Sequence, residues 1–292
     1  MATGETTSGS LADSLPTIIA DARIINEYEG VWKRTCDVRR QTPGTGLNWN
    51  EISLAQLEAQ DITETTENNN AQQVIDTLFT ITPQMVQIMV KITDRTYRKI
   101  AAVVEGKVGE LAGNAMARKP DIDYLDLFST FGTGASPGTG NPLSFGHIAA
   151  AGRRIASNVT EPSTAALCTI LHGYQTYDIE VELRAGIGTY AVPTGMTEEV
   201  FKKGFRGMVA SSNVYEDGHI AIDATPDARG ATHSKAAVVA VQSMSLKYET
   251  RRDPSFGGGA DEIFITNEYG YGERSAGNWA IAHLSDATAP TS

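Results

Sequence analysis

Five histidines are the residues in this sequence best suited to catalysis or metal binding: His147, His172, His219, His233 and His283. Zinc proteases carry two metal-binding histidines in an HExxH motif, and many serine hydrolases carry the nucleophilic serine in a GxSxG motif. Neither pattern occurs here. His172 is the most suggestive, because it ends the strand-like run TILHG and polar residues follow it. No nucleophile accompanies it, so we expect a hydrogen-bonded histidine at a strand-to-helix corner.

Two other groups could carry chemistry. The run GTGASPGTG at 132–140 resembles a phosphate cradle, but it lacks the Gly-Lys-Ser/Thr ending of a P-loop, and we expect a mobile surface loop. Asp121 and Asp123 could in principle be paired acids. Cys36 and Cys168 lie far apart, which indicates reduced, structural thiols. The sequence therefore predicts no enzyme, no cofactor and no metal site.

Residues 93–119 predict a long amphipathic helix, because apolar residues recur at intervals of three and four. The residues expected on its buried face are Tyr97, Ile100, Ala101, Val104, Val108, Leu111, Ala112, Ala115 and Met116. Thr93 or Asp94 can cap its start, and Lys119-Pro120 is expected to end it. Gly106, Gly109 and Gly113 weaken a helix interior, so we expect another backbone to come close there.

Composition excludes several classes of protein. The chain of 292 residues has 41% hydrophobic and 20% charged residues, which is ordinary for a globular protein. Its formal net charge of −11 argues against free nucleic-acid binding, since duplex binders neutralise phosphates with basic surfaces. No signal peptide opens the sequence and no apolar run is long enough to span a bilayer.

The first 90 residues are expected to form two segments that project from the body of the protein. Residues 1–45 begin rich in Ser, Thr, Gly and Ala, then carry several bases, and are expected to form an extended arm ordered only against a partner. Residues 46–90 form two β-like runs around the polar stretch 67–70, which predicts a long hairpin. Between 41 and 90 there are six acids and no base, whereas 91–119 carry seven bases against three acids. We expect Glu58, Glu64 and Glu67 of one copy to face a neighbour's basic surface that includes Arg95, Arg98 and Lys99.

The remainder predicts two or three further helices and many strands. A second amphipathic helix is expected in 143–158, a short one near 174–183 and another in 197–204. Strands are expected in 164–173, 208–216, 219–224, 235–253, 261–272 and 278–285. The fold class that follows is α+β.

Several runs together resemble the major capsid proteins of tailed phages, which share the Hong Kong 97 fold. They occupy 81–100, 143–155, 165–179, 208–223, 234–256 and 268–287, and include LSFGHIAAAGRRI and EYGYGERSAGNWAIAHLSDA. The resemblance implies an N-terminal arm (1–45), an extended loop or E-loop (46–82), a peripheral domain with a long spine helix (83–135), an axial domain (136–242), and a return of the chain to the peripheral domain (243–292).

The resemblance also implies partners. Subunits of that family form the hexamers and pentamers of an icosahedral shell, the virion capsid, around packaged double-stranded DNA. A portal, a separate scaffolding protein and in some cases a cement protein would accompany them, without a membrane, and assembly would occur in the bacterial host cytoplasm. Lys–Asn cross-links join subunits in some members, but no position here can be matched to them. Two alternatives stay open: an encapsulin-like shell that encloses cargo enzymes, and an unrecognised hydrolase.

Overall fold

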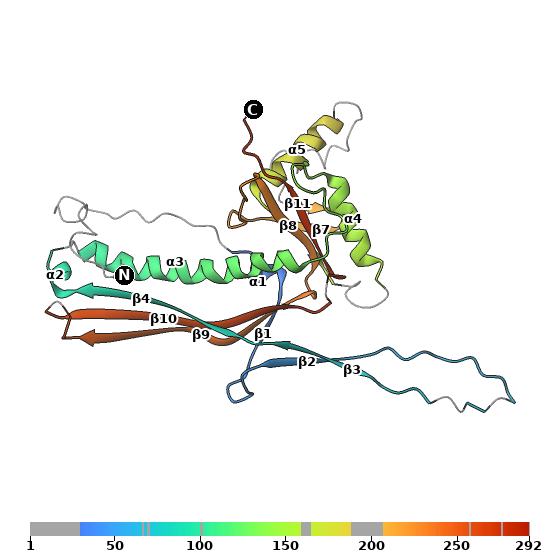
Figure 1. The fold of residues 1–292 in the computed structure, drawn as a ribbon, viewed down its shortest axis with the longest axis horizontal. Helices are drawn as coiled ribbons and strands as arrows, with labels where there is room; N and C mark the ends of the chain where they lie inside the picture. Colours follow the sequence, from blue (N-terminus) through green and yellow to red (C-terminus); the bar gives the residue numbers. More distant parts are fainter. Residues whose placement is uncertain are drawn as a thin grey trace.

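The computed structural model describes residues 30–65, 67–68, 71–99, 102–158, 165–187, 207–256, 258–275 and 277–291. The predicted helix at 197–204 and the first 29 residues of the predicted arm lie outside this part. The described chain is elongated, with a sheet and a long helix lying side by side, a second sheet standing over one end of that helix, and a hairpin that projects beyond it (Figure 1). No helix in the ranges given is long and apolar enough to cross a membrane.

The first body is a four-stranded sheet with the order β1-β9-β10-β4. Its strands are β1 (Asp37–Arg40), β9 (Val238–Asp253), β10 (Ala260–Glu273) and β4 (Gln84–Thr93). β1 pairs with β9 in parallel, and the other pairs are antiparallel. Alternate residues of β4 face the long helix and bury apolar side chains against Ala112 and Met116, joined there by Ile263 and Ile265 of β10.

The long helix differs from its prediction at both ends. Thr93 caps a short helix α2 (Asp94–Tyr97), as expected, and α3 (Ala102–Asp126) follows, then the 3₁₀ helix η2 (Leu127–Thr130). The predicted end at Lys119-Pro120 is wrong, because Pro120 lies inside α3. Tyr124 and Phe128 beyond it are fully buried, so their packing outweighs the backbone hydrogen bond that a proline removes. Leu111, expected to be buried, is 50% exposed.

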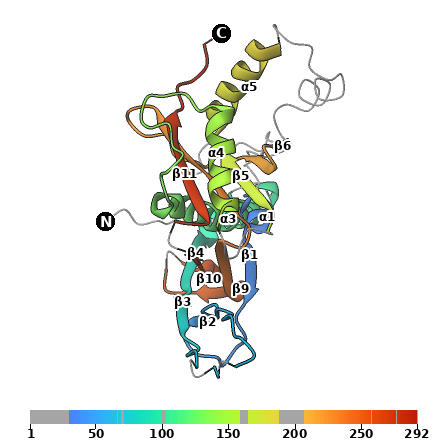
Figure 2. The same ribbon diagram turned by 90° about the vertical axis from the view of Figure 1, so that its right-hand side faces the viewer.

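The second body is a five-stranded sheet with the order β11-β8-β5-β7-β6. Its strands are β5 (Leu167–Leu171), β6 (Met208–Val209), β7 (Ser212–Glu216), β8 (Asp227–Ser234) and β11 (Ala280–Asp286). Two helices accompany it, α4 (Phe145–Ala156) and α5 (Gly173–Ile187), both close to their predicted places. Seen along the molecule, α3 lies between this body and the four-stranded sheet (Figure 2).

Two predicted strands differ in the structure, and two strands were not predicted: β1, in the predicted arm, and β8. Residues 208–216, predicted as one strand, form the antiparallel pair β6 and β7. Residues 219–224 form only an isolated bridge, Ile222 to Ala228, while β8 occupies 227–234. The carboxylate of Asp223 accepts hydrogen bonds from the backbone of Thr225 and Asp227, so this stretch folds as a turn. β8 has no apolar–polar alternation in its sequence, because small and polar residues fill it and nearly all of them are buried.

The predicted hairpin is confirmed for residues 49–81, but residues 84–90, which the prediction also placed in it, belong to β4 of the four-stranded sheet. β2 (Trp49–Leu54) pairs antiparallel with β3 (Asp76–Ile81), and the ribbon projects from the body beyond the four-stranded sheet (Figure 1). Its tip has no regular secondary structure in the described residues between 55 and 75. There Gln72 exchanges two hydrogen bonds with the backbone of Glu58, which holds the two sides of the tip together.

The predicted arm is wrong for residues 30–41, which fold on their own chain. α1 (Trp32–Thr35) buries Trp32 in the main core, edge-on to Tyr271 with ring centroids 5.9 Å apart. β1 then joins the four-stranded sheet. This segment folds against its own chain because Val31, Trp32 and Cys36 are buried there. Exposing these apolar side chains to water would cost more free energy than ordering a short segment.

The two bodies share the last part of the chain. β11 pairs with β8 in the five-stranded sheet, although the sequence-based division grouped 243–292 with the peripheral strands. The division into arm, E-loop, peripheral and axial domains otherwise stays a prediction.

Candidate assembly surface

The hairpin carries the largest set of exposed apolar side chains in the described chain. Those more than half exposed are Leu47, Ile52, Leu54, Leu57, Ile62, Val74, Ile75 and Leu78. Ile52 and Leu78 are direct cross-strand partners, 62% exposed each. Isolated soluble chains rarely leave such a set uncovered. Sequence reasoning weighed the acids of this hairpin and missed the apolar surface, although the alternation of β2 contains the signal.

The base of the hairpin is held firmly on its own body. Trp49 and Phe79 pack edge to face, with ring centroids 6.4 Å apart, over Ile81 and the buried valines of β9. Arg274, the residue after β10, bonds to Glu51 at 2.9 Å and to Asp37 at 2.8 Å. Burial works to raise the pKa of Asp37, but its hydrogen bonds to Arg274 and Arg39 lower the pKa below its ordinary value. Glu51 therefore forms its ion pair within its own chain and is not among the acids available to a neighbouring copy.

The structure does not bring the predicted acidic and basic residues together. Glu58, Glu64 and Glu67 are exposed in the hairpin tip, whereas Arg95, Arg98 and Lys99 are exposed on α2 and just after it. The tip and α2 lie at opposite ends of the molecule (Figure 1). Any contact between them must therefore join two copies. That contact stays a prediction.

One predicted base is already used within the chain. Lys91 lies 2.9 Å from Asp253 and 3.0 Å from Glu262. Its ammonium group therefore links β4 to β9 and β10 at one end of the four-stranded sheet. Hydrogen bonding to Asp253 raises the pKa of Lys91, which stays charged at neutral pH. Arg252 similarly links Asp94 to Asp261. The free positive surface near α2 is smaller than the sequence count suggested.

Gly109 and Gly113 of α3 have no close neighbour among the described residues. A Cβ added at Gly109 or Gly113 would meet nothing within 4 Å. The expected approach of another backbone is therefore wrong within one subunit, because the four-stranded sheet meets the opposite side of α3 at Ala112 and Met116. Gly106 also lies in α3, but its surroundings fall outside the described side chains. An approach by another copy stays a prediction.

His172, His233 and His283 hold structural positions. His172 sits at the corner between β5 and α5, where its Nδ1 accepts a hydrogen bond from the backbone of Tyr174, as predicted. Burial lowers the pKa of His172, and lowers the pKa of His233 and His283 further, to about 4 each. Cys36 and Cys168 are free and buried, and burial raises the pKa of both thiols, that of Cys168 to about 11. Neither thiol is ionised at neutral pH.

The glycine-rich run 132–140 is not a free loop. Gly132 exchanges backbone hydrogen bonds with Ala280 and Ala282, and Gly138 donates to Leu284, so the run follows the edge of β11. A Cβ at Gly132 would lie 2.6 Å from the carbonyl oxygen of Gly277, so only glycine fits. The expectation of a mobile loop is wrong because β11 offers an edge that needs hydrogen-bond partners.

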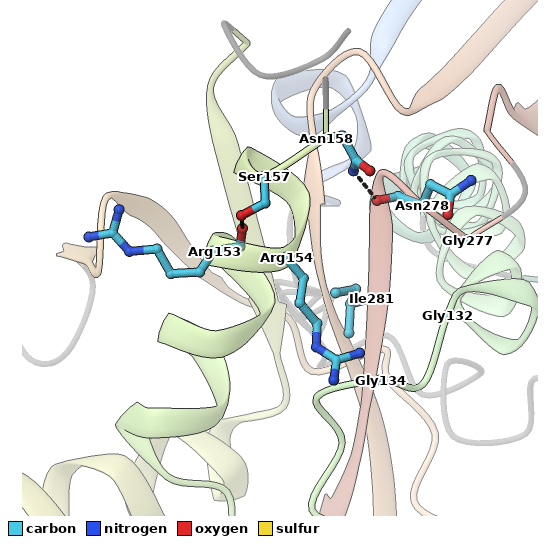
Figure 3. A pocket seen from close by; sticks show the side chains of 9 residues that line it. All are labelled: Gly132, Gly134, Arg153, Arg154, Ser157, Asn158, Gly277, Asn278 and Ile281. Atoms are coloured by element: carbon cyan, nitrogen blue, oxygen red, sulfur yellow. Dashed lines mark hydrogen bonds between the residues drawn. The ribbon is translucent and has the colours of Figure 1, made fainter. Parts of the chain in front are cut away.

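Beside this run is a hollow of about 410 Å³ between α4 and the start of β11. Arg154 reaches into it toward Gly134 while Arg153 points away, and Asn158 donates to the carbonyl of Asn278 at 2.9 Å (Figure 3). The hydroxyl of Ser157 is bonded to the carbonyl of Arg153. These groups fix the end of α4 to the loop before β11, and the lining of the hollow contains no base beside a nucleophile.

Solved structures of phage capsids have the same fold as this chain, although no family model and no curated protein matches the sequence. The capsid of cyanophage P-SCSP1u has a TM-score of 0.70 at 14% identity, over 97% of this chain and 96% of that one. The capsid of Helicobacter pylori bacteriophage KHP30 has a TM-score of 0.71 at 11% identity, over 96% and 98%. A chain from Mycobacterium phage Che8 has a TM-score of 0.66 at 15% identity, over 92% and 96%. The predicted α+β phage-capsid fold is confirmed.

Proposed function

We propose that this chain is the major capsid protein of a tailed double-stranded DNA bacteriophage and has a structural rather than a catalytic role. Copies would form hexamers and pentamers of an icosahedral shell. The observation that carries the proposal combines two features. The chain has a phage-capsid fold, and its hairpin is anchored at its base to the four-stranded sheet while apolar side chains along it are exposed to water.

The shape of the subunit supports assembly through unlike surfaces. The hairpin projects from one end, and α2 with the ends of β4, β9 and β10 forms the other (Figure 1). A surface that binds a different surface on the next copy gives a ring when the rotation closes. The hairpin of each subunit would then cover apolar residues on its neighbour, and closed rings would leave no hairpin uncovered.

Charge would set the register of that contact. Glu58, Glu64 and Glu67 would lie near Arg95, Arg98 and Lys99 of an adjacent subunit. One exposed ion pair contributes only about 0–1 kcal/mol, but the contact repeats at every subunit, and complementary charge disfavours wrong pairings.

The further partners follow from the proposed role. A portal, a separate scaffolding protein and, outside the shell, a cement protein would join the subunits during assembly in the host cytoplasm. The packaged DNA would be enclosed without sequence-specific binding, consistent with the formal net charge of −11.

Electron microscopy of the purified full-length chain tests the shell, and a double variant tests the hairpin. Ile52→Ser with Leu78→Ser removes one exposed apolar cross-strand pair, so we expect dispersed, folded subunits. The matched control is Ser53→Ala with Thr77→Ala, the next pair along the ribbon, whose side chains lie on its opposite face. A wild-type chain that stays monomeric at every concentration, or normal shells from the Ile52/Leu78 variant, would contradict the proposal.

A charge swap tests the register. Reversing Glu58, Glu64 and Glu67 to Lys is expected to slow assembly at low salt, with a smaller defect at high salt because screening weakens exposed charge pairs. Reversing Arg95, Arg98 and Lys99 to Glu in the same chain is expected to restore the rate. If the combined variant assembles no faster than the variant in which only Glu58, Glu64 and Glu67 are replaced by Lys, the two surfaces do not meet.

A further inference from the structure

Three metal-binding side chains meet where α3, the N-terminal segment and the loop after β7 come together. They are Asp121 of α3, and Asp217 and His219 of the loop, with one potential ligand atom each, all within 4.8 Å of one another. Asp121 and Asp217 have no exposed surface, and the side chain of His219 is 13% exposed. The cluster therefore lies at the interface of the two bodies with one side reachable from solvent.

The spacing of these atoms suits a shared cation. His219 Nδ1 lies 3.0 Å from Asp121 Oδ2 and 3.3 Å from Asp217 Oδ1. Two ligands that each lie about 2.1 Å from a zinc ion are separated by roughly 3–3.4 Å in tetrahedral or octahedral geometry. His219 Nδ1 therefore already has this separation from both carboxylates, and the two carboxylate oxygens lie within 4.8 Å of each other.

The hydrogen bonds within the chain do not satisfy the cluster. Asp217 Oδ1 accepts from the backbone of His219 at 2.8 Å, but its buried Oδ2 has no hydrogen-bond partner. Among the described residues, Asp121 Oδ1 accepts a long bond of 3.4 Å from the backbone of Trp32. A buried carboxylate oxygen without a partner costs free energy. Burial raises the pKa of Asp217 to about 7, which means that this carboxylate is stabilised by taking up either a proton or a cation.

The donor set indicates which cation would bind. Calcium and magnesium sites in proteins are built from oxygen ligands, whereas a histidine nitrogen with two carboxylates suits zinc and its neighbours in the first transition series. Three protein ligands leave at least one coordination position for water on the side of His219.

We propose that Asp121, Asp217 and His219 bind one divalent transition-metal ion of the zinc type, which ties the long helix to the second body. Sequence reasoning predicted no metal, because about a hundred residues separate Asp121 from its partners and no spacing pattern marks them. This inference depends on the cluster alone and stands or fails independently of shell assembly. An ion bound only by the folded chain would stabilise it against unfolding.

The test uses full-length chain stripped of metal with a chelator. Co²⁺ added to it is expected to give visible absorption bands that saturate at one ion per chain and disappear when Zn²⁺ is added. Asp217→Asn and His219→Gln should each weaken Zn²⁺ binding at least tenfold in competition with a chromogenic chelator. Zn²⁺ should raise the unfolding temperature of the wild type and of the control variant His172→Gln, but not of the two cluster variants.

Three results would overturn the proposal. One is the absence of saturable binding by the wild type. Another is equal Zn²⁺ affinity in wild type and Asp217→Asn. The third is stability that depends on pH at this cluster but not on metal, which would indicate carboxyl groups that share a proton. If His219→Gln does not fold, Asp217→Asn decides, because the amide keeps the shape of the side chain while weakening it as a ligand.

Discussion

Tyr124 Oη of α3 lies 2.6 Å from Nε2 of His233 in β8, with both side chains fully buried. His233 Nδ1 faces the carbonyl oxygen of Ser234 at 2.9 Å, and a carbonyl can only accept, so Nδ1 carries the proton and Tyr124 donates to Nε2. Thr35 donates in turn to Tyr124 at 2.9 Å. One chain of hydrogen bonds therefore connects the N-terminal segment, the long helix and the five-stranded sheet.

Tyr124→Phe should destabilise the subunit by about 1–3 kcal/mol, since His233 Nε2 and the Thr35 hydroxyl would lose a buried partner. Urea unfolding in the dispersed Ile52→Ser/Leu78→Ser background measures the loss. Tyr248→Phe is the control, because Tyr248 is 57% exposed, and its effect should stay within about 0.5 kcal/mol. Equal effects of the two substitutions would mean that the hydrogen bond to His233 adds nothing to stability.

Acid should destabilise the subunit through His233 and His283. Burial lowers the pKa of each from 6.5 to about 4 in the folded chain. Below pH 6.5 the unfolded chain therefore binds protons that the folded chain does not, so the free energy of unfolding falls as the pH drops toward 4. The loss is on the order of 3 kcal/mol per histidine at most. His283→Gln should flatten this part of the stability curve, measured by urea unfolding between pH 4 and 7. An unchanged slope would show that His283 does not titrate in this way.

Residues 30–41 should be needed for folding, and residues 1–29 only for assembly. Removal of 1–29 is expected to leave a folded subunit that forms few closed shells, since the first residues lack apolar periodicity. Removal of 1–41 takes away Trp32, Cys36 and β1, which belong to the core and the sheet. Loss of Trp32 alone, as Trp32→Ala, should cost about 3–5 kcal/mol. Circular dichroism and thermal unfolding of the two truncations decide, and a cooperative transition in the shorter chain would contradict the expectation.

The sequence predicted those elements whose pattern is local. The alternation in β2, β3, β9 and β10 gave the hairpin and most of the long sheet, and the spacing within 143–158 gave α4. The end of α3 was missed because Tyr124 and Phe128 gain their burial from the second sheet, which no local pattern reveals. β8 was missed since its residues are small and polar, and they are buried through pairing on both sides.

The same difference between local pattern and long-range contact holds for the surface residues. The exposed side chains of Glu58, Glu64 and Glu67 could be anticipated from charge alone, but not that Arg274 binds Glu51 or that Lys91 lies between Asp253 and Glu262. Those contacts join residues far apart in the chain. The Asp121, Asp217 and His219 cluster is the clearest case, because the packing of α3 against the loop after β7 creates it.

Gly109→Ala with Gly113→Ala separates the stability of one subunit from that of the shell. Alanine is better than glycine in a helix interior by about 0.5–1 kcal/mol, and a Cβ at either position meets nothing within 4 Å. The dispersed subunit should therefore become more stable by about 1–2 kcal/mol in urea unfolding. If another copy packs on this side of α3 in the proposed shell, the same methyl groups should disturb capsid expansion or lower particle stability. Gly132→Ala, whose Cβ would lie 2.6 Å from the carbonyl of Gly277, is the contrasting variant and should destabilise the subunit itself. Particles of Gly109→Ala/Gly113→Ala that match wild type in yield, expansion and melting would leave these glycines as tolerated positions on an open helix surface.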